Sequence, residues 1–245
     1  MKTLLLAIAL FAVSAAADEG HHGWDYGSEH GPAHWSELEP DFAGCGTGHL
    51  QSPIDIRNAV ASKLAPIEFD YHPGPLRIID NGHTVQVNYA PGSSITVGDH
   101  KYELVQFHFH RPSEEMINGR AAPMEVHLVH KDSSGALAVV GVLLKRGNEN
   151  PVVKSLWANL PAEKEHEKSA DKVRIDAAGL LPTNHGYYTY EGSLTTPPCS
   201  EGVTWFVMIH PNQISSEQVA RFGKIYEHNA RPVQAINGRP VKVSQ

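Results

Sequence analysis

The chain has 245 residues, with 20 Lys or Arg and 27 Asp or Glu, so its formal charge is −7 when histidine is neutral. Its 41% of hydrophobic and 19% of charged residues are typical of a globular protein and exclude global disorder. The acidic balance argues against nucleic acid or an anionic membrane as the main partner. The 16 histidines are an unusually large number and prompt a search for metal-ligand spacing.

Residues 1–17 have the pattern of a secretory signal peptide. Lys2 precedes an apolar run of ten residues from Leu4 to Val13, and three alanines that end at Ala17 follow it. A membrane anchor is the alternative, but this run is much shorter than the ~20 residues that span a bilayer. We therefore expect an exported protein without a membrane anchor, periplasmic or released, whose residues 18–245 form one domain.

Runs with strand character recur along the rest of the chain. Several alternate polar and apolar residues with period two, and others are continuous and apolar. The Asn81-Gly82 pair marks one turn, and residues 132–135 are expected to join two runs as a hairpin. The expected strands are residues 76–79, 84–89, 102–110, 124–130, 137–144 and 203–209.

Helical patterns are sparse. Residues 151–160 fit one short helix, and Ser215 is an N-cap candidate for a second helix whose apolar face carries Val219, Phe222 and Tyr226. The sequence thus predicts a mainly β domain, built on a large and mostly antiparallel sheet with short peripheral helices.

Three histidines have spacings that could build a metal site. In an alternating strand His108 and His110 share one face, and on a later strand Glu125 and His127 also share a face. If the two strands pair, the three imidazoles converge. Three neutral imidazoles that leave a fourth position open are typical of a catalytic zinc site.

A His-x-His pair alone is weak support, because most such pairs are surface residues or satisfied core residues. Gln106 and Glu125 each stand two residues before a candidate ligand, as expected for groups that orient a ligand through its outer nitrogen. His130 follows His127 by three residues and so lies on the opposite face, where we interpret it as structural.

The chain resembles the α-class carbonic anhydrases, and the form of residues 112–114 resembles their secreted bacterial branch. The resemblance extends from about Trp24 to about Arg239. The motifs that carry it are Gln106–His110, Pro112–Glu114, Glu125–His130, Gln51–Ile56, Tyr190–Cys199, Val203–Trp205, and Asn229 with Arg231-Pro232.

The resemblance implies a central twisted, mostly antiparallel ten-stranded sheet. It also implies zinc-dependent, reversible hydration of carbon dioxide to bicarbonate and a proton, with a weak esterase side activity. One zinc ion per chain would be held by His108, His110 and His127. Attack by zinc-bound hydroxide would then be completed by a histidine that exports the proton.

The family's further site residues can be placed on this chain by the same motifs. Thr195 would accept a hydrogen bond from the nucleophile and donate one to Glu114, and His83 would be the proton shuttle. Gln106, Glu125 and the carbonyl of Asn229 would orient the ligands. An apolar wall that holds the substrate would comprise Val129, Val139, Leu194, Val203 and Trp205. A polar wall with ordered water would comprise Tyr26, Asn81, Gln86 and Thr196. Thr195 and Thr196 would also touch the substrate.

Cys45 and Cys199 are the two cysteines of the chain. An oxidising compartment favours a disulfide between them, with two buried free thiols as the alternative. They match the disulfide pair of secreted family members, and the family also suggests cis bonds at Ser52-Pro53 and Pro197-Pro198.

Two other interpretations stay open at this point. A non-catalytic, carbonic-anhydrase-related binding protein would lack a zinc histidine, whereas a zinc store would need several exposed sites. Arg111, Glu115 and Gln86 depart from the commoner family pattern near the ligands. Both a monomer and a homodimer are compatible with the sequence, and bacterial relatives favour the homodimer.

Overall fold

The structure is a computed structural model that describes residues 23–245, so the expected signal peptide at residues 1–17 lies outside the described residues. Most of the described chain is extended, and its helices are short. The helices are α1 (Trp35–Leu38), α2 (Gly44–Thr47), α3 (Pro151–Ala158) and α4 (Ser216–Gly223), with 3-10 turns η1 (Pro40–Phe42) and η2 (Ala177–Leu180). No helix within residues 23–245 is long and apolar enough to cross a membrane.

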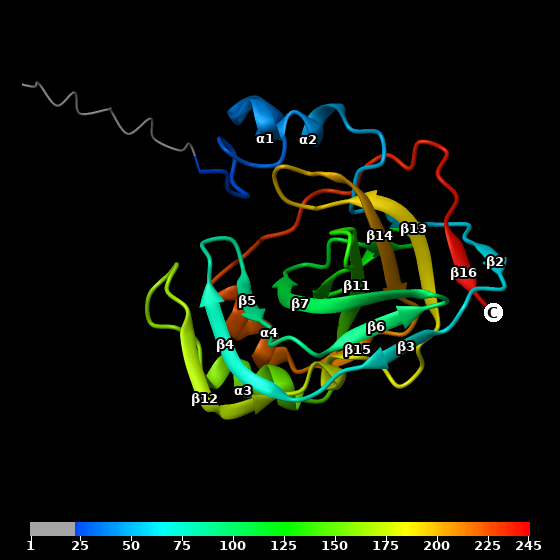
Figure 1. Cartoon of the computed structure of the whole chain (residues 1–245). Coiled ribbons are helices and arrows are strands. Elements are labelled where there is room, and N and C mark those ends of the chain that lie inside the picture. Colours follow the sequence, from blue (N-terminus) through cyan, green and yellow to red (C-terminus); the bar gives the residue numbers. More distant parts are fainter. Residues whose placement is uncertain (1–22) are drawn as a thin grey trace, which may run out of the picture.

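One large mixed sheet dominates the molecule (Figure 1). Its continuous path of ten strands, in the order β12-β4-β5-β7-β10-β11-β14-β13-β16-β2, confirms the expected central sheet. These strands are β2 (Val60–Ser62), β4 (Gly74–Asp80), β5 (Val85–Asn88), β7 (His100–His110), β10 (Met124–Lys131), β11 (Leu137–Arg146), β12 (Lys168–Ile175), β13 (Tyr187–Ser193), β14 (Glu201–Met208) and β16 (Lys242–Ser244).

Three more strands attach beside this path, and a small second sheet forms next to it. β3 (Ile67–Asp70) pairs with β6 (Ser94–Val97), which also pairs with β7, and β15 (Asn212–Ile214) pairs with β11. The second sheet contains β1 (Asp55–Ile56), β8 (Met116–Ile117) and β9 (Arg120–Ala121). Within the large sheet the β11–β14, β11–β15 and β16–β2 pairs are parallel, and the others are antiparallel.

The period-two alternation of the central strands separates the core into two faces. Along β11, Val140 and Val142 belong to the larger apolar cluster, whereas Val139 and Leu143 belong to a second cluster. Successive side chains of a strand point to opposite faces, so the two clusters lie on opposite sides of the sheet. Phe109 of β7 belongs to the larger cluster, which places its two histidine neighbours on the other face.

Helices α3 and α4 cover the larger cluster. The α3 helix begins after Asn150, whose side chain accepts hydrogen bonds from two backbone N–H groups. The α4 helix has the expected capping box between Ser215 and Gln218. It ends at Gly223, so Tyr226, which was expected on its apolar face, lies beyond the helix. Its ring nevertheless packs against the larger cluster, and its hydroxyl donates a hydrogen bond to Asp80.

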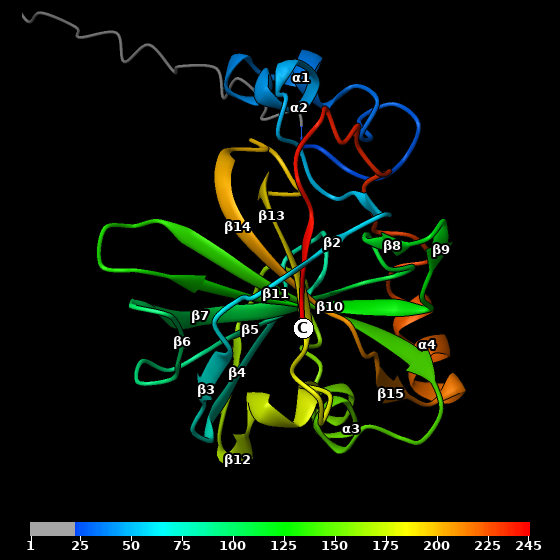
Figure 2. The same cartoon turned by 90° about the vertical axis from the view of Figure 1, so that its right-hand side faces the viewer.

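The N-terminal helices lie at the opposite end of the molecule from α3 in both views (Figures 1 and 2). There Trp35, Cys45 and Cys199 form a third apolar cluster, with Trp24 and Tyr26 packed against it. The Ser52-Pro53 and Pro197-Pro198 bonds are cis, and so is Arg111-Pro112, which the resemblance did not suggest. Trp24 also stacks on His83, so this cluster borders the candidate site.

Candidate metal centre

The antiparallel pairing of β7 with β10 brings the three histidines together. His127 lies directly opposite His108 in the register, and Glu125 lies opposite His110. The ring centroids are 5.0 Å apart for His108 and His110, 5.4 Å for His108 and His127, and 4.5 Å for His110 and His127. One nitrogen of each ring lies within 4.8 Å of the other two, as a shared cation would require.

The outer nitrogens of the rings are held by neighbouring groups. His108 Nδ1 lies 2.9 Å from Gln106 Oε1, and His110 Nδ1 lies 2.7 Å from the carbonyl oxygen of Asn229. Both partners are acceptors, so both Nδ1 atoms carry the proton and both Nε2 atoms are free as ligands. The His127 ring uses its nitrogens the other way round. Its outer nitrogen is Nε2, which lies 3.5 Å from Glu125 Oε1, and its inner nitrogen is Nδ1, which lies 3.9 Å from Glu114 Oε2.

The three rings differ in their electrostatics: His108 and His110 are neutral, as metal ligands must be, whereas the carboxyl groups around His127 favour its charged form. Burial lowers the pKa of His108 to about 3 and holds the pKa of His110 well below its usual value, so both rings are neutral. Burial also disfavours a charged His127, but Glu125 and Glu115 outweigh it and raise the pKa of His127 to about 10. The Nε2 atom of His110 is buried without a hydrogen-bond partner among the described residues. A three-imidazole donor set with this orphaned nitrogen fits zinc with one open position.

Glu114 and Thr195 lie beside the three rings. Glu114 is fully buried; its Oε1 accepts a hydrogen bond of 2.7 Å from the backbone N–H of Arg231, and its Oε2 lies 3.5 Å from His110 Nε2. The Thr195 side chain is also hydrogen-bonded to this carboxyl group. Burial raises the pKa of Glu114 to about 7, while His127 and the hydrogen bonds from Arg231 and Thr195 act in the opposite direction.

His83 sits on a tight turn between β4 and β5. The Asn81 side chain accepts hydrogen bonds from the backbone N–H groups of His83 and Thr84, and Gly82 adopts a φ of 86°, which favours glycine. The His83 ring stacks on Trp24 with centroids 3.6 Å apart and 7° between the planes. Its partial burial lowers its pKa, against the opposing charges of Asp25 and Glu165.

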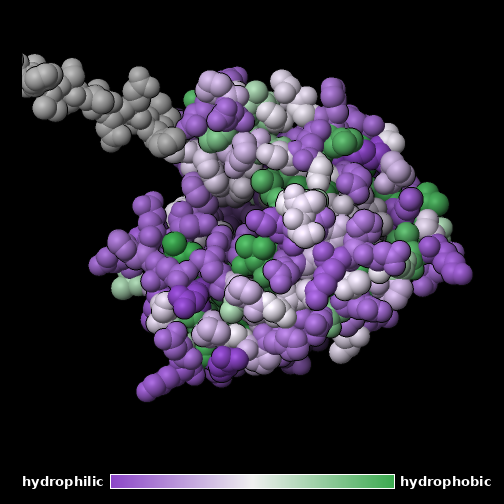
Figure 3. Space-filling model, viewed as in Figure 1, coloured by the Kyte–Doolittle hydropathy of each residue, from purple (hydrophilic) through white to green (hydrophobic). Residues whose placement is uncertain are grey.

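The space around His83 is open. His83 and Tyr26 line a cavity of about 990 Å³ that also reaches Arg111 and Tyr226. Figure 3 shows the surface hollowed below the segment that carries α1 and α2. Asn229 links this region to the metal ligands, because its side-chain amide donates to the His83 carbonyl at 3.1 Å and its own carbonyl accepts from His110.

The residues of the expected apolar wall lie together on the histidine face of the sheet. Trp205 packs edge-on against the His127 ring, with centroids 4.9 Å apart. All five wall residues belong to one apolar cluster, in which Val139, Val203 and Trp205 are buried and Val129 and Leu194 are partly buried.

The expected polar wall is connected by side-chain hydrogen bonds. Asn81 donates to Gln86 Oε1 at 3.5 Å, and Gln86 donates to Asn88 at 2.7 Å. Burial and the charge of Glu114 raise the pKa of Tyr26 well above its usual value, so its hydroxyl stays neutral. Thr196 is partly buried, and its carbonyl accepts the backbone N–H of Cys199 at 2.8 Å.

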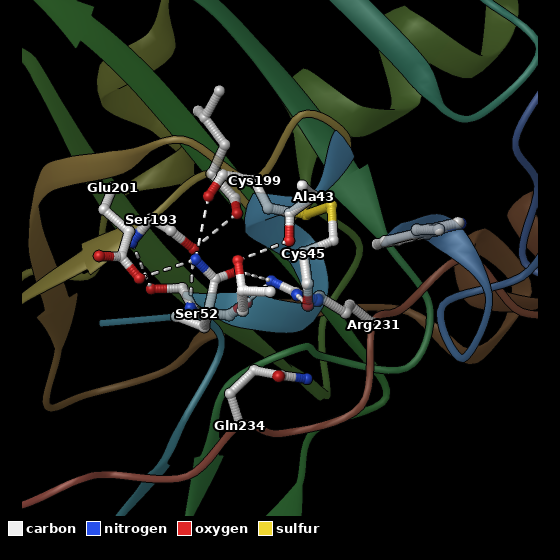
Figure 4. The surroundings of a disulfide bond; sticks show 12 residues. Ala43, Cys45, Ser52, Ser193, Cys199, Glu201, Arg231 and Gln234 are labelled. Atoms are coloured by element: carbon white, nitrogen blue, oxygen red, sulfur yellow. Dashed lines mark hydrogen bonds between the residues drawn. A yellow bond between two sulfur atoms is a disulfide. The ribbon is translucent and has the colours of Figure 1, made fainter. Parts of the chain in front are cut away.

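A disulfide joins Cys45 to Cys199, with an S–S distance of 2.07 Å. The Arg231 guanidinium lies beside it (Figure 4), where it donates to the Cys45 carbonyl at 2.8 Å and to the Ser52 carbonyl at 2.7 Å. The backbone N–H of the same arginine holds Glu114. Arg231 thus connects the disulfide segment to the carboxyl group at the centre of the site.

Sequence reasoning assigned no role to Trp24, Glu115, Tyr190 or Arg231, although all four lie at the site. Trp24 and Arg231 come from segments without periodic pattern, so nothing in the sequence shows which way their side chains point. Glu115 stands next to Glu114 in a loop and was noted only as a departure from the family. A buried acidic residue in a loop resembles an exposed one until its partners are known.

Comparison with known proteins agrees with this geometry. The model of the eukaryotic-type carbonic anhydrase family matches residues 30–245. A carbonic anhydrase of Pectobacterium carotovorum is 43% identical over 96% of this chain and 97% of its own, and one from a Nostoc strain is 45% identical over 89% and 84%. The structure of an α-carbonic anhydrase from Thermovibrio ammonificans, in complex with the inhibitor sulfanilamide, superimposes with a TM-score of 0.87. That protein is 43% identical, and the match covers 92% of this chain and 100% of its own.

Proposed function

The chain belongs to the eukaryotic-type carbonic anhydrase family, a family of enzymes, and from that premise we propose that it hydrates carbon dioxide reversibly at one zinc ion held by His108, His110 and His127. The observation that carries the proposal is the convergence of three imidazole nitrogens within 4.8 Å on the face next to Thr195 and Glu114. When bound, zinc is a Lewis acid that makes water a usable nucleophile near neutral pH, as in carbonic anhydrases generally.

Thr195 and Glu114 orient the nucleophile in this proposal. Glu114 accepts the backbone N–H of Arg231, so its carboxyl group is fixed before substrate arrives. An ionised Glu114 accepts a hydrogen bond from the Thr195 hydroxyl, so the threonine oxygen is left to accept a hydrogen bond from the nucleophile. This fixed direction turns the nucleophile towards the substrate carbon, and correct orientation contributes to rate more than to affinity.

The apolar cluster beside the rings is the proposed place for carbon dioxide. Carbon dioxide is apolar, so a wall of Val139, Val203 and Trp205 can hold it loosely without a dedicated hydrogen bond. Bicarbonate is charged and gains nothing from this wall, which favours its departure after the reaction.

His83 is the proposed proton shuttle. Its lowered pKa keeps the ring neutral at pH 7, so the ring can accept a proton and pass it to buffer. The neighbouring side chains of Asn81 and Gln86 offer polar groups along the path from the rings to the cavity that His83 lines.

Stopped-flow measurement of carbon dioxide hydration on metal-stripped protein, with zinc titrated back, tests the function. Activity that rises linearly and saturates at one zinc per chain is the expected result. One tightly bound zinc without hydration would instead indicate a non-catalytic relative, and several weakly bound zinc ions would indicate a zinc store. Slow hydrolysis of an activated ester should follow the same titration.

We also propose that residues 1–17 direct export and are removed, leaving residues 18–245 as the catalytic domain in the periplasm or outside the cell. The disulfide supports an oxidising compartment. N-terminal sequencing of protein from the cell envelope and the medium tests this.

The homodimer stays a prediction, which light scattering of the same preparation tests. Sulfanilamide is a suitable first inhibitor, because it binds the Thermovibrio relative.

A further inference from the structure

Two buried carboxylates, not one, converge on the outer nitrogen of His127. Glu125 Oε1 and Glu115 Oε2 each lie 3.5 Å from His127 Nε2. All three side chains are buried, with Glu115 and Glu125 at 0% exposure and His127 at 1%. The carboxylate at Glu125 was expected from the family motif, but the second one was not.

The other oxygen of each carboxyl group is already engaged. The Tyr190 hydroxyl donates a hydrogen bond of 2.8 Å to Glu115 Oε1. Glu125 Oε2 accepts the backbone N–H groups of Glu114 and Glu115, at 2.9 and 3.1 Å. Each carboxyl group is therefore fixed at one oxygen and directs the other oxygen at the imidazole.

The three atoms that face one another have no other hydrogen-bond partner among the described residues. Glu115 Oε2, Glu125 Oε1 and His127 Nε2 are all buried and otherwise unpaired. Burying polar atoms without partners is costly, so their convergence indicates that they act on one another. A carboxylate at the outer nitrogen of a ligating histidine orients the ring and raises its basicity as a ligand.

We propose that Glu115 is a second positioning residue for His127, which together with Glu125 clamps the ring so that Nδ1 faces the cavity and the metal is retained. This inference rests on the proposed function, because it takes His127 as a metal ligand. The clamp is anchored outside the metal site, since Ser52 Oγ lies 3.2 Å from the Tyr190 hydroxyl and accepts the backbone N–H of Ser193 at 3.1 Å.

The alternative is that Glu115 serves packing alone, as a buried partner for Tyr190. The two roles differ in their effect on the metal site: only the positioning role predicts that changing Glu115 alters how tightly the metal is held. Glu115→Gln keeps the shape and can still accept a hydrogen bond from the Tyr190 hydroxyl, but it replaces the carboxyl group that faces His127 with an amide. Glu115→Asp keeps a carboxyl group but moves it away from His127, because its side chain is one methylene shorter. Glu191→Gln is the matched control, because Glu191 is an exposed carboxylate on the same strand as Tyr190.

The experiment measures how fast zinc passes from each loaded protein to a chelator, and the visible spectrum of each cobalt(II)-loaded protein. We expect Glu115→Gln to release zinc about 10- to 100-fold faster than the wild-type chain. Glu115→Asp should lie between the two, and Glu191→Gln should match the wild type. The cobalt spectrum should shift in the Glu115 variants alone, because it reports the ligands around the ion.

Wild-type release rates and spectra in both Glu115 variants would overturn the inference. If Glu115→Gln does not fold, Glu115→Asp alone decides. A wild-type chain that holds two metal ions, of which Glu115→Gln loses one, would also overturn it, since Glu115 would then be a ligand. A wild-type chain that binds no zinc would overturn the proposed function as well, which distinguishes that failure from the failure of the clamp alone.

Discussion

The surroundings of each histidine decide what its imidazole can do. Burial lowers the pKa of both His108 and His130 to about 3, yet one ring faces two other imidazoles and the other stacks on Tyr71. His83 is only half-buried, so its pKa falls less and its ring remains in reach of solvent. The same side chain can thus serve as a ligand, a structural group or a proton carrier.

Replacing the shuttle should slow proton export without affecting zinc. We expect His83→Ala to reduce carbon dioxide hydration in weak buffer by about 10- to 100-fold, because general acid-base groups contribute factors of this order. Added imidazole buffer should restore most of the rate, and the zinc content should stay at the wild-type value. His166→Ala is the control, because His166 is exposed and 4.0 Å from Glu163. An unchanged rate in weak buffer would remove His83 from the proton path.

The stack on Trp24 should tune the shuttle's pKa. Burial is the largest cause of the lowered pKa of His83, and the indole covers one face of the ring. In Trp24→Ala the ring is better hydrated, so its charged form is less disfavoured and its pKa should rise towards 6.5. An NMR titration of the His83 ring protons measures this shift. A pKa that stays constant or falls would show that other groups, such as Lys164, set its value.

At the scale of elements, the sequence predicted the regular part of the site and missed the irregular part. Period-two alternation located β7, β10 and the shared face of the histidines, because both strands are long and central. The two-residue β1 and the three-residue β2 and β16 are too short to carry a period. The loop that carries Glu114 and Glu115 has no period either, so the approach of Glu115 to His127 could not be predicted from the sequence.

The strand β10 carries an acid-sensitive group at His130, whose Nε2 lies 2.8 Å from the Tyr71 hydroxyl. Burial lowers its pKa to about 3, whereas an unfolded chain would bind a proton there near pH 6.5. Above pH 6.5 the folded and unfolded states bind equally few protons at this site. Between pH 6.5 and about 3 the unfolded state binds more, so the stability contributed by neutral His130 is lost as the pH falls.

We therefore expect the free energy of unfolding to fall on acidification, with His130 accounting for at most about 3 kcal/mol between pH 6.5 and 4.5. In His130→Gln, which cannot titrate, the pH dependence should be weaker by that amount, even if the variant is less stable at pH 7. Urea unfolding at the two pH values measures both effects. The exposed His72→Gln variant should keep the wild-type slope, and an equally steep slope in His130→Gln would contradict the assignment.

At the scale of the whole molecule, the site depends on contacts between segments far apart in the chain. Arg231 near the C-terminus, the N-terminal segment with Cys45 and the loop with Cys199 meet around the disulfide (Figure 4). The backbone N–H of Arg231 also holds Glu114. The metal ligands sit on central strands that the core holds independently. Breaking the disulfide should therefore disturb the orientation of Thr195 and Glu114, and with it the turnover rate, more than it disturbs zinc binding.

Opening the disulfide tests this division. Cys45 and Cys199 are 154 residues apart, and for a loop of that length the chain-entropy model gives about 5 kcal/mol as an upper expectation. Reduction should lower the melting temperature by roughly 10 °C or more. It should also slow hydration, because the Cys199 backbone N–H holds the carbonyl of Thr196, next to Thr195. Zinc content should not change.

The double variant Cys45→Ser, Cys199→Ser controls for side effects of the reductant. It should melt at the lowered temperature and show no further change when reductant is added. If reduced wild-type protein, with both thiols shown to be free, kept its melting temperature, the disulfide would not limit the stability of the fold. If the melting temperature fell while hydration stayed constant, other contacts would hold the loop of Thr195, such as the Gln51 side chain, which donates to the Cys199 carbonyl at 3.0 Å and does not depend on the sulfur bridge.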